Sequence, residues 1–387
     1  MRVMILVTHL LGTGHLSRAL TLGRAFGGNG HDTHVVSGGV PVENLSEDGI
    51  TLHQLPPVKS DGVNFTTLLT EQGAVADGDY LARRKAALLF CLEQIEPDVI
   101  ITELYPFGRR VLKGEFQALL NRAQEATDPP LVFSSIRDIL APPSKPQKAL
   151  ETEAVAAVYY DGVLVHSDAE ITPLEASWPV GAMLADKLQY TGYVAPPAAG
   201  GHPNGTGAGE VLVTAGGGSV GQNLFEAAVK AAALDPENRW RLLVGGADKE
   251  RVIRDLQDMV QGSNVIVEPT RPDFRQMLTG AKIAVCMCGY NTAMDLLQSR
   301  IPAVFVPFDA GGEVEQTLRA ESLAKQTGFT VVRAADATPE VLVAAVQDLS
   351  GAEVQPLDPK QFQGATQAVE IVEQFYEKQK VRSKAHE

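Results

Sequence analysis

The feature that most constrains the fold of this chain is an alternation of short apolar runs with amphipathic helical patterns. In the first half, Leu16, Leu20, Gly23 and Phe26 fall on one helical face, and residues 80–95 form a longer apolar-striped helix. The apolar runs between such patterns predict buried strands at 3–8, 33–37, 98–104, 131–135 and 162–166. This alternation is typical of an α/β domain in which helices cover both faces of a parallel sheet.

The same alternation restarts after a stretch rich in proline and glycine. Residues 195–209 have almost no large apolar side chain and no periodicity, which predicts a linker. Beyond it we expect strands at 210–214, 240–244, 265–268, 283–287 and 303–306, and helices at 220–233 and 249–261. The sequence therefore predicts one Rossmann-like domain over 1–194, a linker over 195–209, a second Rossmann-like domain over 210–356, and a closing helix with its tail over 357–387. Ligands are expected in a crevice where the two domains face each other.

Charge and composition exclude several classes of function. A formal net charge of −14 argues against non-specific nucleic-acid binding, which needs Lys and Arg to neutralise phosphates. No apolar run approaches the ~20 residues of a membrane-spanning helix, and the first run is too short for a signal peptide. We therefore expect a cytoplasmic protein with no transmembrane segment, while peripheral membrane contact stays open.

The cysteines predict neither disulfides nor a metal site. The sequence contains three of them, Cys91, Cys286 and Cys288, which is too few for a disulfide framework. Cys286 and Cys288 have no second pair of Cys or His nearby, as a zinc site would require. We expect buried structural cysteines, no metal and no cofactor.

The first motif, Gly12 to His15, follows the first expected strand and opens the first helix. Glycines there permit close backbone approach, and the free N–H groups favour an anion. Ser17 stands where a dinucleotide fingerprint has its third glycine. His15 could deprotonate a substrate hydroxyl, because its ordinary pKa is near physiological pH; a helix-capping or exposed histidine is the alternative. Glu103, at the end of the 98–104 strand, is a second candidate base, with a hydrogen-bonded crevice residue as its alternative.

The second motif is the glycine-rich turn of residues 216–221 before an amphipathic helix. Such a turn can hold a diphosphate with backbone N–H groups and the helix dipole. Gly216, Gly218 and Gly221 also satisfy G-x-G-x-x-G, so NAD binding is an open alternative. The acidic residue expected about twenty positions later is not cleanly placed, since Asp248 comes late.

The third motif follows the 283–287 strand. Gly289 makes a turn, Asn291 or Thr292 starts a helix, and Asp295 lies in its first turns, where a carboxylate can accept both hydroxyls of a ribose. The alternative for Asp295 is a carboxylate that only interacts with the helix dipole. A further strand, at 303–306, is followed by Glu315 and Gln316. These two residues could bind sugar hydroxyls or form a surface pair.

Taken in this order, the motifs resemble those of GT-B glycosyltransferases, in particular the MurG-like group of glycosyltransferase family 28. The stretches 102–110, 135–140 and 190–194 look like a bacterial subgroup of predicted glycosyltransferases. Three departures are Cys288, where a serine is common, Asn291, at a position that is often apolar, and the absence of an obvious long apolar segment for docking a lipid-linked acceptor. The resemblance implies that Gly12, Thr13, Gly14 and His15 lie near the acceptor, and that the donor is bound by Gly217, Gly218, Ser219, Gly221, Gly289, Asn291, Thr292, Asp295, Glu315 and Gln316.

We therefore expect metal-independent transfer of a sugar from a nucleoside-diphosphate donor, with a UDP-sugar expected, to an unknown acceptor hydroxyl. The acceptor classes left open are saccharides, lipid-linked compounds and small molecules, and the resemblance implies inversion. His15 or a nearby carboxylate would remove the proton while the glycine-rich turn stabilises the leaving diphosphate. The alternatives are a nucleotide-sugar hydrolase or epimerase, an NAD-dependent oxidoreductase, and a regulator that only senses a nucleotide sugar.

Overall fold

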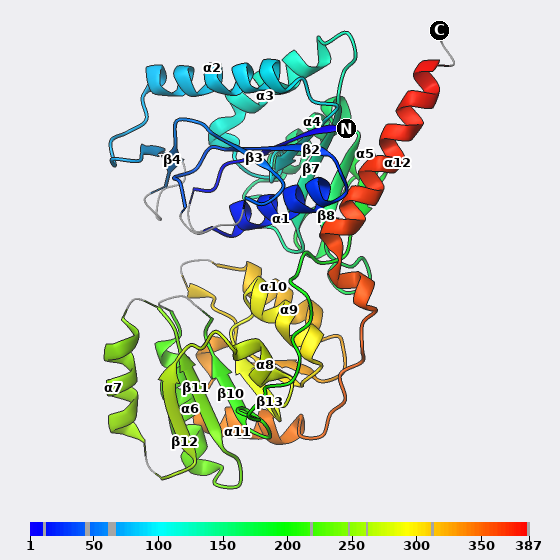
Figure 1. Cartoon of the computed structure of the whole chain (residues 1–387). Coiled ribbons are helices and arrows are strands. Elements are labelled where there is room, and N and C mark those ends of the chain that lie inside the picture. Colours follow the sequence, from blue (N-terminus) through cyan, green and yellow to red (C-terminus); the bar gives the residue numbers. More distant parts are fainter. Residues whose placement is uncertain are drawn as a thin grey trace. The chain divides into compact units, whose positions relative to one another are not determined.

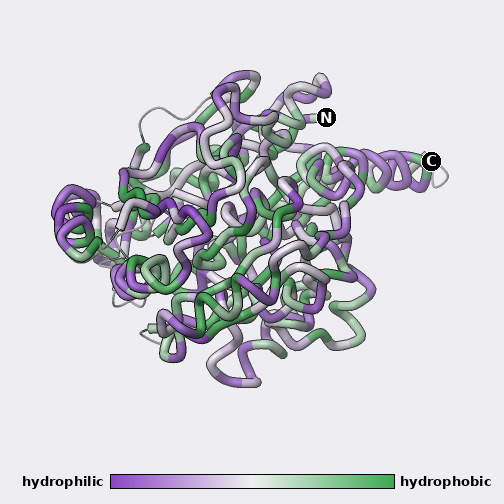
Figure 2. The backbone as a smooth tube through the Cα atoms, turned by 90° about the horizontal axis from the view of Figure 1, so that it is seen from below, coloured by the Kyte–Doolittle hydropathy of each residue, from purple (hydrophilic) through white to green (hydrophobic). Residues whose placement is uncertain are grey.

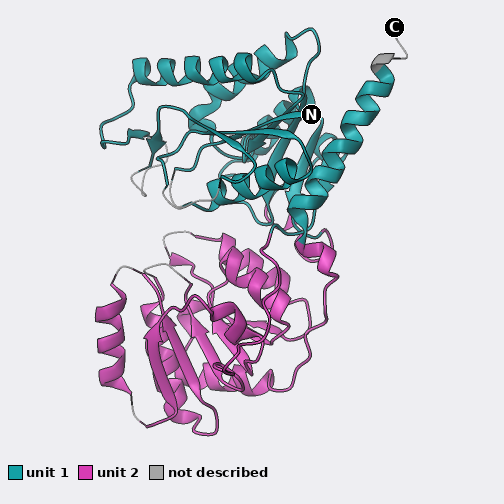
Figure 3. Cartoon of the chain, viewed as in Figure 1, with its two compact units in different colours: residues 1–168, 178–194, 363–387 teal, residues 169–177, 195–362 magenta. Residues whose placement is uncertain are grey.

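The structure of the chain is a computed structural model that describes residues 1–10, 13–42, 47–60, 67–216, 220–246, 248–260, 262–310 and 313–384 (Figure 1). It divides into two compact units (Figure 3). Unit 1 consists of Met1–Asp168, Trp178–Val194 and Gln363–Glu387, and unit 2 of Ala169–Ser177 and Ala195–Phe362. Residues 195–209, expected as a linker, contain no helix or strand and belong to unit 2.

Unit 1 is built on a seven-stranded parallel sheet with the strand order β3-β2-β1-β6-β7-β8-β9. Its strands are β1 (Arg2–Val7), β2 (Asp32–Ser37), β3 (Thr51–Gln54), β6 (Val99–Glu103), β7 (Leu131–Arg137), β8 (Gly162–His166) and β9 (Leu188–Tyr190). Its helices are α1 (Gly14–Gly28), α2 (Gly78–Ile95), α3 (Lys113–Gln124), α4 (Pro146–Tyr159), α5 (Ala182–Ala185) and α12 (Gly364–Lys384). A small antiparallel pair, β4 (Val58–Lys59) and β5 (Leu69–Thr70), lies beside the sheet.

The period of two along the strands explains how helices cover both faces of this sheet. In β1, Met4 and Leu6 pack with α2 and α3, whereas Val3, Ile5 and Val7 pack with α1 and α12. The expected closing helix is therefore α12, and it joins the core of unit 1, where Phe375 meets the ring of Phe133 edge-on at 5.3 Å. Figure 2 colours the last turns of α12 mostly as hydrophilic, as their Lys and Arg content requires.

Unit 2 is built on a six-stranded parallel sheet with the order β12-β11-β10-β13-β14-β15. Its strands are β10 (Val211–Thr214), β11 (Trp240–Val244), β12 (Val265–Pro269), β13 (Ile283–Cys286), β14 (Ala303–Phe305) and β15 (Phe329–Val331). Its helices are α6 (Gln222–Leu234), α7 (Lys249–Met259), α8 (Phe274–Leu278), α9 (Tyr290–Ser299), α10 (Glu315–Leu323) and α11 (Pro339–Asp348). Both units thus confirm the predicted α/β class with parallel sheets.

Candidate functional site

Each sheet contains one point at which the strand order reverses, and ligands of open α/β sheets bind at the carboxyl ends of the strands there. In unit 1 this switch point lies between β1 and β6, which pair directly. In unit 2 it lies between β10 and β13. Most of the predicted site residues lie at the ends of these four strands or directly after them, whereas Glu315 and Gln316 follow β14.

At the switch point of unit 1, the two candidate bases predicted from the sequence lie in contact. His15 is the second residue of α1, and Glu103 is the last residue of β6. His15 Nδ1 lies 2.8 Å from Glu103 Oε1. A carboxylate at this distance accepts the Nδ1 proton of a neutral imidazole, which leaves the Nε2 lone pair as the basic atom.

Arg18, one turn further along α1, also donates to Glu103 Oε1. Its Nη2 is 3.1 Å from His15 Nδ1, so the guanidinium lies against both groups. Burial lowers the pKa of His15 to about 4. The positive charges of Arg18 and Arg109 also lower it, whereas the hydrogen bond and the charge of Glu103 raise it. Although its own burial opposes ionisation, Arg18 and His15 hold the pKa of Glu103 well below its usual range. At neutral pH the pair is therefore a neutral imidazole beside an ionised carboxylate.

Glu103 Oε2 accepts a hydrogen bond of 2.6 Å from the hydroxyl of Ser135, which faces it across the β6–β7 register. Sequence reasoning did not select Arg18, Ser135 or the next residue in this chain of contacts, His166. An arginine inside a helix and a serine inside a strand carry no local signal. The pairing of β6 with β7 places Ser135 beside Glu103, the pairing of β7 with β8 adds His166, and Arg18 comes from α1.

The acceptor-side residues are placed only in part. Gly12 lies outside the described residues. Thr13 precedes α1, and Gly14 is its first residue. Among the described residues, no atom lies within 4 Å of where a Cβ on Gly14 would be.

Three arginines near the unit 1 switch point have different surroundings. Arg109 donates through Nε to the backbone oxygen of Thr8, and burial lowers its pKa to about 10. Arg110 lies over the Trp178 ring and donates to Thr152, so it has a structural role. Arg137 is the last residue of β7, within electrostatic range of Arg109.

At the switch point of unit 2, the described part of the glycine-rich turn has a backbone that only glycine adopts easily. Gly216 and Gly221 have φ of 77° and 109°. A Cβ on Gly221 would lie 2.3 Å from the Cβ of Ala215. Gly217, Gly218 and Ser219 lie outside the described residues. Gly221 is followed directly by α6, so the turn leads to a helix amino terminus as predicted.

The turn after β13 lies beside this glycine-rich turn, because β10 and β13 are neighbours. A Cβ on Gly216 would lie 4.0 Å from Thr292 Oγ1. Helix α9 begins at Tyr290, one or two residues earlier than expected, with Gly289 before it. Asn291 is exposed and Thr292 is half-buried. The amino termini of α6 and α9 therefore both lie at the unit 2 switch point. Helix amino termini favour the binding of an anion.

Asp295, predicted to accept ribose hydroxyls, is already engaged by a cation. Its Oδ1 lies 2.7 Å from Arg275 Nε of α8. Arg275 also donates through Nη2 to Gln298 Oε1 and to the Pro197 oxygen, both at 2.8 Å. Burial nevertheless raises the pKa of Asp295 above its usual value. Asp295 thus connects α9 to the 195–209 segment through Arg275.

The last predicted pair lies at the start of α10. Gln316 Oε1 accepts a 3.2 Å bond from the Phe308 N–H, and the Glu315 N–H donates to Glu313 at 2.7 Å. Arg319, one turn on, is buried and donates to the Cys288 oxygen at 3.0 Å. Sequence reasoning missed Arg319, which joins α10 to the turn before α9.

None of the three cysteines is part of a disulfide; Cys286 and Cys288 are buried, and Cys91 is partly exposed. The part of the chain that the structure describes contains no group of three or more His, Cys, Asp and Glu that could hold a metal ion. No helix in that part has the length and apolarity to cross a membrane.

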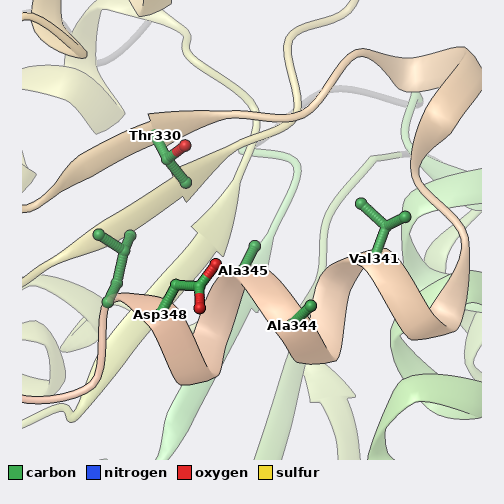
Figure 4. A pocket seen from close by; sticks show the side chains of 6 residues that line it. Thr330, Val341, Ala344, Ala345 and Asp348 are labelled. Carbon is green, nitrogen blue, oxygen red and sulfur yellow. The ribbon is translucent and has the colours of Figure 1, made fainter.

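A shallow pocket of about 270 Å³ lies elsewhere in unit 2 (Figure 4). Thr330 of the edge strand β15 forms one side, and Val341, Ala345 and Asp348 of α11 form the other. It contains none of the predicted site residues.

Known proteins resemble this chain in sequence and in fold. Residues 211–375 match the glycosyltransferase family 28 C-terminal domain. Two curated relatives are both named UDP-N-acetylglucosamine–N-acetylmuramyl-(pentapeptide) pyrophosphoryl-undecaprenol N-acetylglucosamine transferase. The one from Bacillus pumilus is 25% identical over 111 residues, which is 29% of this chain and 30% of that protein. The one from Brucella suis is 32% identical over 136 residues, 34% and 36% of the two chains. The chain thus spans about a third of the length of these relatives.

Solved structures match nearly the whole chain. MurG of Acinetobacter baumannii has a TM-score of 0.61 at 16% identity and covers 95% of both chains. The glycosyltransferase of kitacinnamycin has a TM-score of 0.61 at 19% identity, covering 96% of this chain and 98% of that one. The fold is therefore that of the GT-B class, with two Rossmann-like domains. Within that fold class the chain is similar to MurG, and its residues 211–375 match the model of the glycosyltransferase family 28 C-terminal domain.

Proposed function

We propose that the protein is a glycosyltransferase that moves a sugar from a nucleoside-diphosphate donor, with UDP as the expected nucleotide, to an acceptor hydroxyl. The observation that carries the proposal is the contact of His15 with Glu103 at the switch point of unit 1. A neutral imidazole whose Nδ1–H is held by a carboxylate is a general base for a hydroxyl, and the imidazolium that forms is stabilised by that carboxylate. UDP is chosen because the curated relatives are named as using a UDP-sugar.

In the proposed reaction, Nε2 of His15 takes the acceptor proton as the acceptor oxygen bonds to the anomeric carbon. The bond from that carbon to the diphosphate oxygen breaks, and the nucleoside diphosphate leaves with the electron pair. A direct displacement inverts the anomeric centre. The amino termini of α6 and α9 stabilise the negative charge on the leaving diphosphate through backbone N–H groups, without a metal ion.

The residue assignments are part of the proposal. Unit 2 binds the donor through the glycine-rich turn of residues 216–221, Gly289, Asn291 and Thr292, with Asp295, Glu315 and Gln316 at the ribose and the sugar. Gly12, Thr13 and Gly14 meet the acceptor, whose class is to be found by screening saccharides, lipid-linked compounds and small molecules. We also propose a cytoplasmic location, because three cysteines are too few for the disulfide framework of a secreted protein.

NAD binding is disfavoured by a specific observation. The second strand of a dinucleotide-binding domain ends near an acidic residue that binds the ribose. The corresponding strand here, β11, ends at Val244 and is followed by Gly245 and Gly246. The next acidic residue, Asp248, has a side chain that is 71% exposed and faces Arg251.

The test is calorimetric titration of the wild type, Asp295→Ala and Arg275→Gln with UDP, GDP, TDP, CMP and NAD. We expect one nucleoside diphosphate to bind to the wild type. Asp295→Ala should weaken that binding about tenfold or more, because hydrogen bonds to a charged group are lost. Arg275→Gln, which keeps the Asp295 carboxylate but removes its ion pair and the bonds of Arg275 to Gln298 and Pro197, should weaken nucleotide binding less. Binding of NAD alone, or equal nucleotide affinity in all three proteins, would overturn the donor-site assignment.

A further inference from the structure

Glu103 is the end point of a buried chain of hydrogen bonds that the proposed reaction does not itself use. Beyond Ser135, whose hydroxyl is 2.6 Å from Glu103 Oε2, His166 Nε2 lies 3.0 Å from Ser135 Oγ. On the other side of its ring, His166 Nδ1 lies 2.8 Å from Thr191 Oγ1. Ser135, His166 and Thr191 are all 0% exposed. Four neighbouring segments of unit 1, which are β6, β7, β8 and the turn after β9, therefore supply one polar chain.

The chemistry of each group fixes the direction of the hydrogen bonds. An ionised Glu103 has no proton to donate, so the Ser135 hydroxyl must donate to it. The Ser135 oxygen then has to accept from His166, which requires the proton of a neutral imidazole on Nε2. Burial lowers the pKa of His166 to about 3, so the ring is neutral and its Nδ1 directs a lone pair toward the Thr191 hydroxyl, which also lies 2.8 Å from the Gly192 oxygen. The donors of His166 and Ser135 thus both point toward Glu103.

We propose that Ser135 and His166 are positioning residues for the His15–Glu103 pair, and this inference rests on the proposed function. They hold one carboxylate oxygen, so that the other oxygen faces His15 Nδ1 and keeps the His15 Nε2 lone pair available. The charged and titratable groups that face Glu103 are His15 and Arg18 from α1, Arg109 after β6, and His166 beyond Ser135. Ser135 and His166 touch neither acceptor nor donor in the proposed reaction, so they act through Glu103.

Ser134 offers a matched control in the same strand. It is also 0% exposed, and its hydroxyl also donates one hydrogen bond, of 2.8 Å, but to the backbone oxygen of Tyr105. Ser134→Ala and Ser135→Ala therefore remove the same atoms from equally buried sites. Thermal unfolding of both variants shows whether their losses of stability match.

The first experiment needs no substrate. Nitrogen-15 NMR of histidine side chains at pH 7 reports which ring nitrogen carries the proton. We expect Nδ1–H for His15 and Nε2–H for His166 in the wild type, and a changed His15 signal in Ser135→Ala but not in Ser134→Ala. A His166 proton on Nδ1, or identical His15 signals in both variants, would overturn the proposal.

The second experiment measures turnover of the UDP-sugar with the acceptor found by screening. Ser135→Ala and His166→Leu should lower kcat about tenfold and leave KM unchanged, because a hydrogen bond to a charged group is lost. His166→Gln, whose amide can still donate to Ser135, should restore most of that loss. Equal kcat in Ser135→Ala and Ser134→Ala would contradict the positioning role. If the wild type turns over no donor, the proposed function fails, and the NMR result alone decides whether the chain of donors exists.

Discussion

The two switch points are built from different groups. In unit 1, buried side chains surround a single carboxylate: His15, Arg18 and Ser135 all contact Glu103. In unit 2, the described residues at the same place are glycines and the first residues of α6 and α9, with Thr292 nearby. The first arrangement is made of groups that exchange protons, and the second of backbone donors that do not.

This difference suits two halves of one reaction. A base must have a pKa that its neighbours can adjust, and only side chains provide that. A leaving diphosphate needs donors that are already oriented and whose charge does not change with pH, and peptide N–H groups at helix amino termini are such donors. In the proposed reaction, proton transfer therefore belongs to unit 1 and charge stabilisation to unit 2, and variants in either unit test this division.

The largest effect is expected from His15→Ala. Removing the general base should lower kcat by roughly 10² to 10⁴, while UDP binding, which the proposal places in unit 2, stays unchanged. His53→Ala is the control, because His53 pairs with His34 on β3 and β2, at 3.0 Å, and has no contact with Glu103. Steady-state rates of both variants measure kcat, and titration with UDP measures their nucleotide affinity. A kcat for His15→Ala equal to that of His53→Ala would remove the main argument for the assignment.

Acidification should destabilise unit 1 before unit 2. The pKa values of His15 and His166 are lowered from 6.5 to about 4 and about 3. Below pH 6.5 the two histidines therefore bind protons in the unfolded chain but not in the folded one. Their contribution to the free energy of unfolding is fully present above pH 6.5 and is lost as the pH falls toward the folded-state pKa values. The loss is about 2 kcal/mol per histidine between pH 6.5 and 5. The ionised Glu103, whose pKa is lowered, adds a loss at still lower pH.

Of the charges around these histidines, Arg18 opposes protonation of both rings and so adds to the effect of burial, whereas Glu103 favours protonation and offsets only part of it. In unit 2 the partly buried Asp295 has a raised pKa, so protonation of this carboxyl on acidification favours the folded form. Hydrogen exchange of peptides from β7 and β8, compared with peptides from β10 and β11 at pH 7.5 and 5, measures the difference. Faster opening of the β10 and β11 peptides at pH 5 would contradict it.

A smaller effect is expected for the backbone of the glycine-rich turn. Gly221→Ala and Gly351→Ala both place an alanine at positive φ, 109° and 81°, at a cost of about 1–2 kcal/mol. Only at Gly221 does the new Cβ also collide, 2.3 Å from that of Ala215, whereas at Gly351 it has no neighbour within 4 Å. Gly221→Ala should therefore melt at a lower temperature and bind UDP at least about tenfold more weakly. Equal melting and UDP affinity in the two variants would show that the turn is not part of the donor site.

The sequence predicted the central strands of both sheets because they are buried on both faces and form continuous apolar runs. It missed the edge strands β3, β9 and β15, which are short and partly exposed. In the site, His15 and Glu103 were found separately, each from its place at a strand end. Their contact depends on β1 pairing with β6, which no local pattern contains.

The ion pair of Asp295 shows the same limit in unit 2. A carboxylate near a helix start was visible in the sequence, but its partner Arg275 comes from the preceding helix, and the two meet only because α8 packs on α9. Side chains that act across elements, such as Ser135, His166 and Arg319, require the topology before they can be recognised.

The smallest effect is expected from a metal chelator. Chelation tests whether backbone donors alone stabilise charge in unit 2. If backbone N–H groups at the starts of α6 and α9 neutralise the leaving diphosphate, EDTA should leave the rate of sugar transfer within about a factor of two. Magnesium sites in enzymes use carboxylates beside the phosphates. At the unit 2 switch point the Asp295 carboxylate is paired with Arg275, and Glu313 accepts the Glu315 N–H. Loss of transfer in EDTA and recovery with Mg²⁺ would mean that unit 2 binds the donor as a metal complex and that its glycine turns are not sufficient for charge stabilisation.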